Sequence, residues 1–249
     1  MYILDDNIRL HAELQKPEGF TGRCPLVIII HGFTGHTEER HILAVSDALL
    51  ELGFATLRVD MYGHGTSDGE FRNHTLFKWM TNAMTVIDYA RGLDFVTDLY
   101  LLGHSQGGLT VMLAGALKRD VIRAIVPMSP AVMIPEGARA GHVLGMEFDP
   151  EHVPEEFLLP SGRTLGGNYI RAAQTIYPET FIRAFRGPVL IVHGDADEAV
   201  PVHYGVDAAK AYENAKLVII PGDTHCYNYH LDMAVDAVRA WMRGFIGQE

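Results

Sequence analysis

The sequence predicts an α/β protein built on a doubly wound, mostly parallel sheet, and two patterns lead to this fold class. Short apolar runs alternate along the chain with longer segments whose apolar residues recur at helical spacing. The runs lack the apolar and polar alternation of a half-exposed strand, which is typical of parallel strands covered by helices on both faces. A strand followed by a helix, repeated several times, gives such a sheet.

The expected elements follow from these two patterns in chain order. Residues 1–22 are expected to add an antiparallel edge strand or hairpin. The expected strands are runs rich in leucine and β-branched residues, Leu26–Ile30, Ala55–Val59, Leu99–Leu102, Ala124–Pro127, Val189–Val192 and Leu217–Ile220. The expected helices have apolar residues three or four positions apart, in Arg40–Leu52, Leu76–Gly92, Gly107–Lys118, Tyr204–Tyr212 and Leu231–Phe245.

The stretch from Pro130 to Gly187 interrupts this alternation. It contains no strong buried-strand run and is longer than a crossover helix requires. One interpretation is a helical excursion whose apolar residues only cover the domain, and the other is a cap that contacts substrate. We favour the cap, because ligands bind above the strand ends in sheets of this kind. The prediction is one domain over residues 1–249 with a cap insertion at about 130–187.

Composition and charge exclude several classes of protein. Hydrophobic residues make up 48% of the 249 residues and charged residues 20%, which excludes a disordered, collagen-like or coiled-coil chain. The formal charge of −11 provides no basic surface for nucleic acid or anionic lipid. No stretch approaches the ~20 apolar residues of a membrane helix, and the first residues do not resemble a signal peptide. We therefore expect a cytoplasmic protein that binds neither nucleic acid nor membrane.

No cofactor or metal is expected. The two cysteines, Cys24 and Cys226, are too few for a disulfide framework or a zinc site made of cysteines, and we expect free thiols. His36 and His41 are too far apart in sequence for the His-Glu-x-x-His pattern of zinc peptidases. The sequence also lacks the glycine-rich motifs that bind dinucleotides and nucleoside triphosphates.

The strongest chemical signal is the Gly-x-Ser-x-Gly pattern centred on Ser105. It follows the expected strand Leu99–Leu102 and begins the expected helix Gly107–Lys118. At such a junction the two glycines allow a turn so tight that the serine hydroxyl is exposed. The start of a helix also leaves free N–H groups near a developing negative charge. The pattern therefore indicates that Ser105 is a nucleophile.

A serine needs a base to take its proton and an acid to orient that base. Asp197 and His225 follow the expected strands Val189–Val192 and Leu217–Ile220, so both should lie at the same edge of the sheet as Ser105. We favour Asp197 as the acid. Asp195 is the main competitor, and Glu198 is a third candidate.

Two backbone N–H groups are expected to stabilise the oxyanion of the tetrahedral intermediate. One belongs to Gln106, directly after the nucleophile, and the other to Phe33, in the glycine-containing loop after Leu26–Ile30. His31 in the same loop is expected to hold the loop by a hydrogen bond rather than to take part in catalysis.

With these residues in view, the chain resembles the α/β-hydrolase superfamily and, within it, the bacterial feruloyl (cinnamoyl) esterases. The stretches that carry the resemblance are His31–His36, Asp60–Gly65, Gly103–Gly108, His193–Pro201 and Gly222–Cys226, with Phe148–Glu151 and Gly167–Tyr169 in the insertion. The resemblance implies Ser105 as nucleophile, His225 as base and Asp197 as acid. It implies Phe33 and Gln106 as oxyanion donors.

The resemblance also implies that the cap binds an aromatic acyl group, with Tyr169 near the phenolic end of the substrate. Gly137 and Leu144 stand where some relatives have polar cap residues, which leaves the preference among cinnamoyl esters open. The expected activity is hydrolysis of hydroxycinnamate esters through an acyl-enzyme. The expected partner is a small aromatic ester, and a homodimer is possible. The alternatives are a short-chain acyl esterase or monoglyceride lipase and a catalytically silent ligand-binding hydrolase fold.

Overall fold

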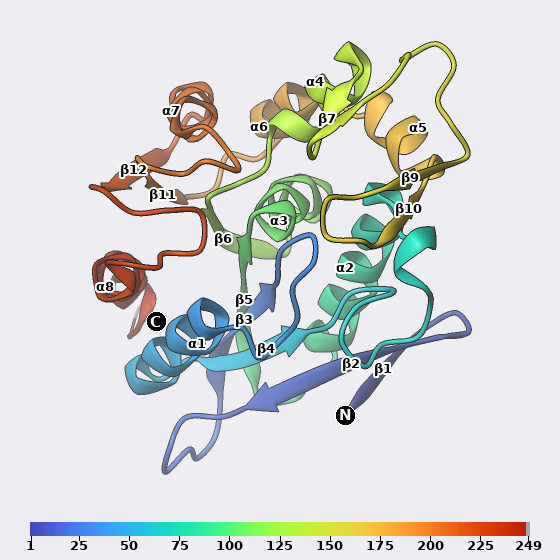
Figure 1. Ribbon diagram of the computed structural model, residues 1–249. Coiled ribbons are helices and arrows are strands. Elements are labelled where there is room, and N and C mark those ends of the chain that lie inside the picture. The colour runs from blue at the N-terminus through green and yellow to red at the C-terminus, as the bar shows by residue number, and fades with distance from the viewer. Residues whose placement is uncertain (248–249) are drawn as a thin grey trace.

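An eight-stranded sheet runs through the centre of the computed structural model, which describes residues 1–247 (Figure 1). In spatial order the strands are β1 (Tyr2–Asp5), β2 (Ile8–Gln15), β4 (Ala55–Val59), β3 (Cys24–Ile30), β5 (Val96–His104), β6 (Ile122–Met128), β11 (Val189–Gly194) and β12 (Ala215–Ile220). All pairs from β4 to β12 are parallel, while β1, β2 and β4 pair antiparallel. The predicted doubly wound, mostly parallel sheet is confirmed, and an N-terminal hairpin forms its edge.

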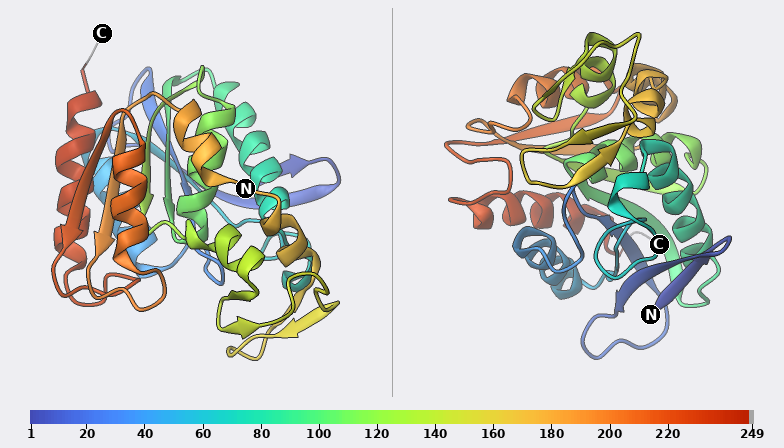
Figure 2. Two further views of the ribbon diagram at one scale, coloured as in Figure 1. Left: turned by 90° about the horizontal axis from the view of Figure 1, so that it is seen from above. Right: turned by 45° about the vertical axis from the view of Figure 1, so that its right-hand side comes forward.

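Helices cover both faces of the sheet, as the view from above in Figure 2 shows. On one face α1 (Arg40–Leu52) packs beside α8 (Leu231–Met242). On the other face lie α2 (Leu76–Arg91), α3 (Gln106–Leu117) and α7 (Val202–Ala211). This double covering explains the uninterrupted apolar run Leu26–Ile30 of β3, in which every residue is buried. Within residues 1–247, no helix has both the length and the apolar character needed to cross a membrane.

The predicted elements differ from the observed ones mainly at their ends. The strand β5 continues past Leu102 to His104, so that the chain passes directly from the sheet into Ser105. The last helix ends at Met242, and a short 3₁₀ helix, η2 (Arg243–Phe245), takes the place of its expected final turn. A second short 3₁₀ helix, η1 (Phe71–Asn73), precedes α2 and was not expected from the sequence.

The cap segment, defined as residues 130–187, contains three short helices and two small antiparallel sheets. The helices are α4 (Met133–Ala140), α5 (Asn168–Gln174) and α6 (Pro178–Ala184). The sheets pair β7 (His142–Val143) with β8 (Met146–Glu147) and β9 (Glu156–Leu158) with β10 (Thr164–Gly166). Strands of two or three residues leave no periodic signal, so the sequence could not reveal them.

The cap segment contributes to two hydrophobic clusters. Most of its apolar side chains pack together and against Leu109 and Leu113 of α3. Ile182 and Phe185, near its end, belong instead to the core between the sheet and its helices. The segment therefore covers the domain and also stands over the start of α3, where Ser105 lies.

Candidate active site

Ser105 lies at a sharp turn between β5 and α3. Its backbone has φ 56° and ψ −119°, a conformation that residues other than glycine rarely adopt. A Cβ on Gly103 would lie 2.2 Å from the carbonyl oxygen of Gly107, and a Cβ on Gly107 would lie 2.3 Å from the carbonyl oxygen of His31. Both glycines of the motif are therefore required by close backbone approach, and the strain at Ser105 follows from the same tight turn.

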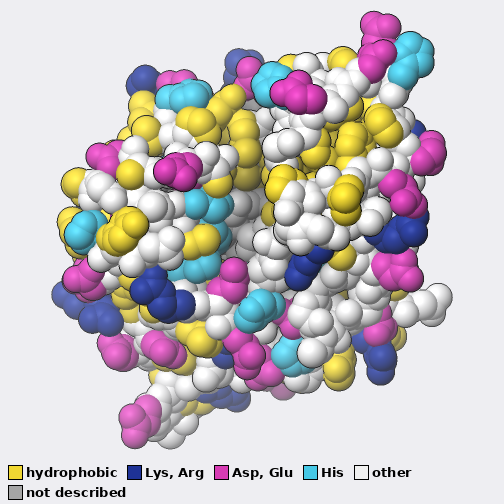
Figure 3. All heavy atoms as spheres, in the orientation of Figure 1, with side chains coloured by type: hydrophobic (Ala, Val, Ile, Leu, Met, Phe, Trp, Pro, Cys, Tyr) yellow, Lys and Arg dark blue, Asp and Glu magenta, His cyan; other side chains and the backbone are white. Residues whose placement is uncertain are grey.

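A cavity opens beside Ser105, and His225 also lines it. The cap segment contributes an apolar wall made of Ala131, Met133, Ile134 and Leu144. Figure 3 shows this face of the molecule hollowed, with hydrophobic side chains gathered along the upper part of the hollow. The cavity therefore combines an apolar compartment with a hydroxyl and an imidazole.

His225 and Asp197 are joined by a hydrogen bond of 2.8 Å between His225 Nδ1 and Asp197 Oδ2. The Asp197 side chain has no solvent exposure, and it accepts two further hydrogen bonds, both from backbone N–H groups. Oδ1 accepts from the backbone N–H groups of Ala199 and Val200, and Oδ2 also lies 3.2 Å from His193 Nε2. Burial by itself would raise the pKa of Asp197, but the hydrogen bonds from His193 and His225 outweigh it and hold the pKa well below its usual range.

Asp195, the competing candidate for the acid, lies elsewhere in the same loop. Its side chain is exposed, and Oδ1 accepts a 2.6 Å hydrogen bond from the backbone N–H of Gly222. Asp195 thus ties together the two loops that carry Asp197 and His225. Among the described residues, only Asp197 of the three candidate acids is bonded to His225.

His104, the residue before Ser105, holds the backbone of His225. Its Nε2 lies 2.8 Å from the carbonyl oxygen of His225, and because a carbonyl only accepts, Nε2 must carry the proton. The rings of His41 and His104 are in edge contact at 4.2 Å, and burial lowers the pKa of both, to about 4 for His41. The imidazoles of His41 and His104, next to His225, therefore stay neutral near pH 7. Sequence reasoning missed His104 because only the fold brings it to His225.

The loop that carries Phe33 is fixed by His31. The backbone N–H of Met61 donates to His31 Nε2 at 3.0 Å, so His31 Nδ1 carries the proton and donates to the carbonyl oxygen of Gly32 at 2.7 Å. Burial lowers the pKa of His31 to about 3, which keeps this neutral tautomer. The carbonyl of Gly32 and the N–H of Phe33 belong to one peptide group. The hydrogen bond from His31 therefore orients the N–H group that we expect to stabilise the oxyanion.

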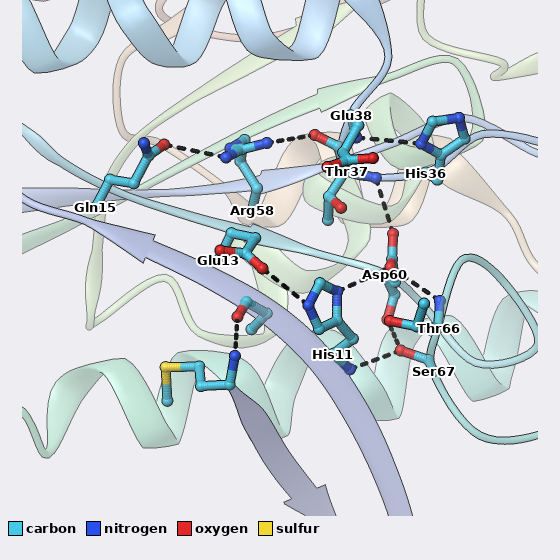
Figure 4. Close-up of polar contacts among 12 residues, drawn as sticks. His11, Glu13, Gln15, His36, Thr37, Glu38, Arg58, Asp60, Thr66 and Ser67 are labelled. Atoms are coloured by element: carbon cyan, nitrogen blue, oxygen red, sulfur yellow. Dashed lines mark hydrogen bonds and ion pairs between the residues drawn. The ribbon is translucent and has the colours of Figure 1, made fainter.

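Asp60, at the end of β4, anchors the next part of that loop (Figure 4). Its Oδ1 accepts from the backbone N–H of Thr37, and its Oδ2 accepts from the N–H of Thr66 and from His11 Nδ1. Arg58 donates to the carbonyl oxygen of Thr37 at 2.6 Å. These contacts attach the loop after β3 to the sheet edge. Buried hydrogen bonds therefore hold the part of the cavity wall that this loop forms.

Tyr169 does not lie on the wall of the cavity. Its side chain is fully buried, and its hydroxyl donates to Gln106 Oε1 at 2.6 Å. These contacts indicate a structural role, and the contact of Tyr169 with the phenolic end of a substrate stays a prediction. Tyr169 holds the side chain of the first residue of α3.

Replacing Tyr169 with phenylalanine is expected to affect all substrates alike. The change would leave Gln106 Oε1 buried without a donor, at a cost of about 1–3 kcal/mol in the free energy of unfolding. Denaturant titration would measure this loss. Equal proportional losses of kcat/KM on methyl ferulate and p-nitrophenyl acetate would fit a role in holding Gln106, whereas a loss confined to the ferulate ester would restore the role at the phenol.

Gly137 and Leu144 show why the cap wall is apolar here. A Cβ on Gly137 would lie 2.5 Å from the carbonyl oxygen of His142, so no side chain fits between α4 and β7. Leu144 lies at the turn of the β7–β8 hairpin with φ 56° and lines the cavity. Neither position offers a polar group to a phenol.

Among residues 1–247, no cluster of three or more potential metal ligands occurs.

Comparisons with known proteins agree with this geometry. A family model described as "Serine aminopeptidase, S33" matches residues 23–155. The solved structure of Est1E from Butyrivibrio proteoclasticus with ferulic acid bound has a TM-score of 0.96 and 60% identity, covering 97% of each chain. Monoacylglycerol lipase from Mycolicibacterium smegmatis is 27% identical over 94% of this chain and 93% of its own length. Protein ABHD12B from Homo sapiens is 29% identical over 79% of this chain, which spans only 54% of that relative.

Proposed function

The chain belongs to the family described as serine aminopeptidase, S33, within the α/β-hydrolases, and we propose that it is a serine esterase that releases hydroxycinnamic acids of the ferulate type from their esters. One observation carries this proposal. The chain is similar over 97% of its length, at 60% identity, to a protein whose structure holds ferulic acid. The apolar wall that the cap segment adds beside Ser105 suits a planar aromatic acyl group.

In the proposed mechanism, Ser105 Oγ attacks the ester carbonyl while its proton passes to His225 Nε2. This nitrogen is available because His225 Nδ1 is bonded to Asp197. The carboxylate of Asp197 stabilises the imidazolium that forms, and the N–H groups of Phe33 and Gln106 stabilise the oxyanion. When the tetrahedral intermediate collapses, the C–O bond to the alcohol breaks and the alcohol leaves with the proton held by His225.

The second half of the reaction repeats the sequence with water. His225 removes a proton from a water molecule as its oxygen attacks the acyl carbon of the acyl-enzyme. The bond to Ser105 Oγ then breaks, Oγ regains the proton from His225, and the hydroxycinnamic acid is released. One ester and one water give one acid and one alcohol, and no cofactor takes part in these steps.

A panel of esters tests the acyl specificity. Burying an aromatic ring removes on the order of 150 Å² from water, worth a few kcal/mol before the costs of ordering and desolvation. We therefore expect kcat/KM for methyl ferulate to exceed that for methyl butyrate by about tenfold or more. Equal values, or a preference for monoacylglycerols, would instead indicate the general esterase or monoglyceride lipase that the relative from Mycolicibacterium smegmatis represents.

Location and assembly remain part of the proposal. Both cysteines are free thiols, Cys24 being buried, and this supports a reducing compartment such as the cytoplasm. The homodimer stays a prediction, which the molar mass in solution would test.

A further inference from the structure

Glu39 lines the same cavity as Ser105 and His225. The residue occupies the N-cap position of α1, where polar side chains commonly accept a hydrogen bond from the first turn of a helix. The Glu39 side chain makes no such bond. Its neighbour Glu38 is exposed, whereas Glu39 is partly buried in the wall of the cavity.

The carboxylate of Glu39 holds a buried oxygen that lacks a partner. Oε2 has no hydrogen-bond partner among the residues that the structure describes. A Cβ on Gly35 would lie 2.1 Å from Oε2, so the carboxylate rests directly on the Cα of Gly35 in space that only glycine leaves free. Burial raises the pKa of Glu39, while the nearby imidazoles of His36 and His225 and a hydrogen bond from the backbone of His36 to the carboxylate oppose that rise. A buried acceptor left without a donor is costly, unless a ligand supplies the donor.

The two sides of the cavity differ in chemistry. The cap segment, with Val200, forms the apolar side, which suits the acyl group. Glu39, Thr34 and Cys226 line the part formed by the loops after β3 and β12. Burial raises the pKa of the Cys226 thiol to about 11, so this neighbour is uncharged near neutral pH.

The mechanism assigns the side beside Glu39 to the alcohol. The leaving oxygen must lie against His225, because His225 protonates it. Cys226 follows His225 directly in the chain, and its thiol is close enough to Glu39 for the carboxylate to raise its pKa. Among the described residues that line the cavity, Glu39 is the only acidic one, so its carboxylate is the one that faces an alcohol held through its leaving oxygen at His225.

We propose that Glu39 binds the leaving alcohol, by accepting a hydrogen bond from a second hydroxyl group on it. The favoured substrates are then esters of alcohols with two or more hydroxyls, rather than esters of simple alkanols. This inference rests on the proposed function for the position of the acyl group. It adds a polar subsite for the alcohol to the apolar subsite for the acid.

Two esters that differ by one hydroxyl test the proposal, ethyl ferulate and 2-hydroxyethyl ferulate. A hydrogen bond to a charged acceptor is stronger than one to a neutral acceptor, so the unmodified enzyme is expected to favour the 2-hydroxyethyl ester by at least about tenfold in kcat/KM. Glu39→Leu should bring the ratio of the two kcat/KM values close to one. Glu39→Gln, which keeps an acceptor without the charge, should give an intermediate ratio, and Glu38→Gln is the matched control that should keep the native ratio.

A ratio near one in the unmodified enzyme, or a ratio that Glu39→Leu leaves unchanged, would overturn the proposal. Equal losses of kcat/KM on both esters would leave that ratio unchanged, and they would assign Glu39 to the support of His225. Failure of the proposed function would give a different result: the enzyme would cleave p-nitrophenyl acetate efficiently but neither ferulate ester. In that event the pair ethyl butyrate and 2-hydroxyethyl butyrate would repeat the test of Glu39 without the aromatic acid.

Discussion

Replacing Ser105 with alanine is expected to lower kcat for methyl ferulate by at least about 10⁴-fold while the protein stays folded. The loss is large because no other group at the turn between β5 and α3 could form the acyl-enzyme. Alanine keeps the Cβ of serine, so the strain of the positive φ at this position is unchanged and stability should hardly move. Steady-state kinetics and the thermal unfolding midpoint, measured on the same preparation, give both quantities.

A serine-directed phosphonate is the control for this variant. It should label the unmodified enzyme at Ser105 and leave Ser105→Ala unlabelled, which mass spectrometry of the active-site peptide would show. Substantial turnover by a folded Ser105→Ala protein would refute the nucleophile assignment.

Replacing Asp197 with asparagine is expected to lower kcat by on the order of 10⁴-fold. The reason lies in the three hydrogen bonds that its carboxylate accepts, two on Oδ1 from backbone N–H groups and one on Oδ2 from His225, with His193 Nε2 3.2 Å from Oδ2. An asparagine must place its NH₂ group either against the N–H groups of Ala199 and Val200 or against His193 and His225. In both orientations donors face donors, and His225 loses the partner that fixes its tautomer.

Asp195→Asn is the matched control for the acid. Its side chain accepts one hydrogen bond, from the backbone of Gly222, and an asparagine oxygen can still accept it. We expect kcat to change by less than about threefold, since the lost charge is exposed to solvent. A larger loss for Asp195→Asn than for Asp197→Asn, with both proteins folded, would reverse the assignment of the acid.

The fold was predictable because the physical cause of the pattern is local. The run Leu26–Ile30 of β3 is buried on both faces, so its residues are apolar without interruption, and this can be read from consecutive residues. The short strands of the cap segment gave no such signal. Leu144 illustrates the difficulty, because a leucine with positive φ is not the residue that a tight turn predicts.

The candidate site was predictable only where a motif ties chemistry to the end of a strand. Ser105, Asp197 and His225 each follow a buried strand directly, and the common sheet edge brings them together. His104 contacts the backbone of His225, which is far along the chain, and His193 lies 3.2 Å from the buried carboxylate of Asp197. The sequence carries no sign of either contact. The hydrogen bond from Tyr169 to Gln106 was likewise not predictable, because a likeness in sequence does not say which partner a side chain bonds.

The layout of the cap segment bears on how such an enzyme can diverge. The apolar wall of the cavity comes mainly from one continuous insertion, while Ser105, Asp197 and His225, the proposed nucleophile, acid and base, come from loops at the sheet edge. Ile182 and Phe185 fix the end of the insertion in the main core, but the two small hairpins, β7–β8 and β9–β10, lie outside that core. Leu144, at the turn of β7–β8, lines the cavity, so substitutions there can alter which acids are accepted without disturbing the main core or the chemical step. Gene duplication could therefore yield esterases of new acyl specificity by changes in this segment alone.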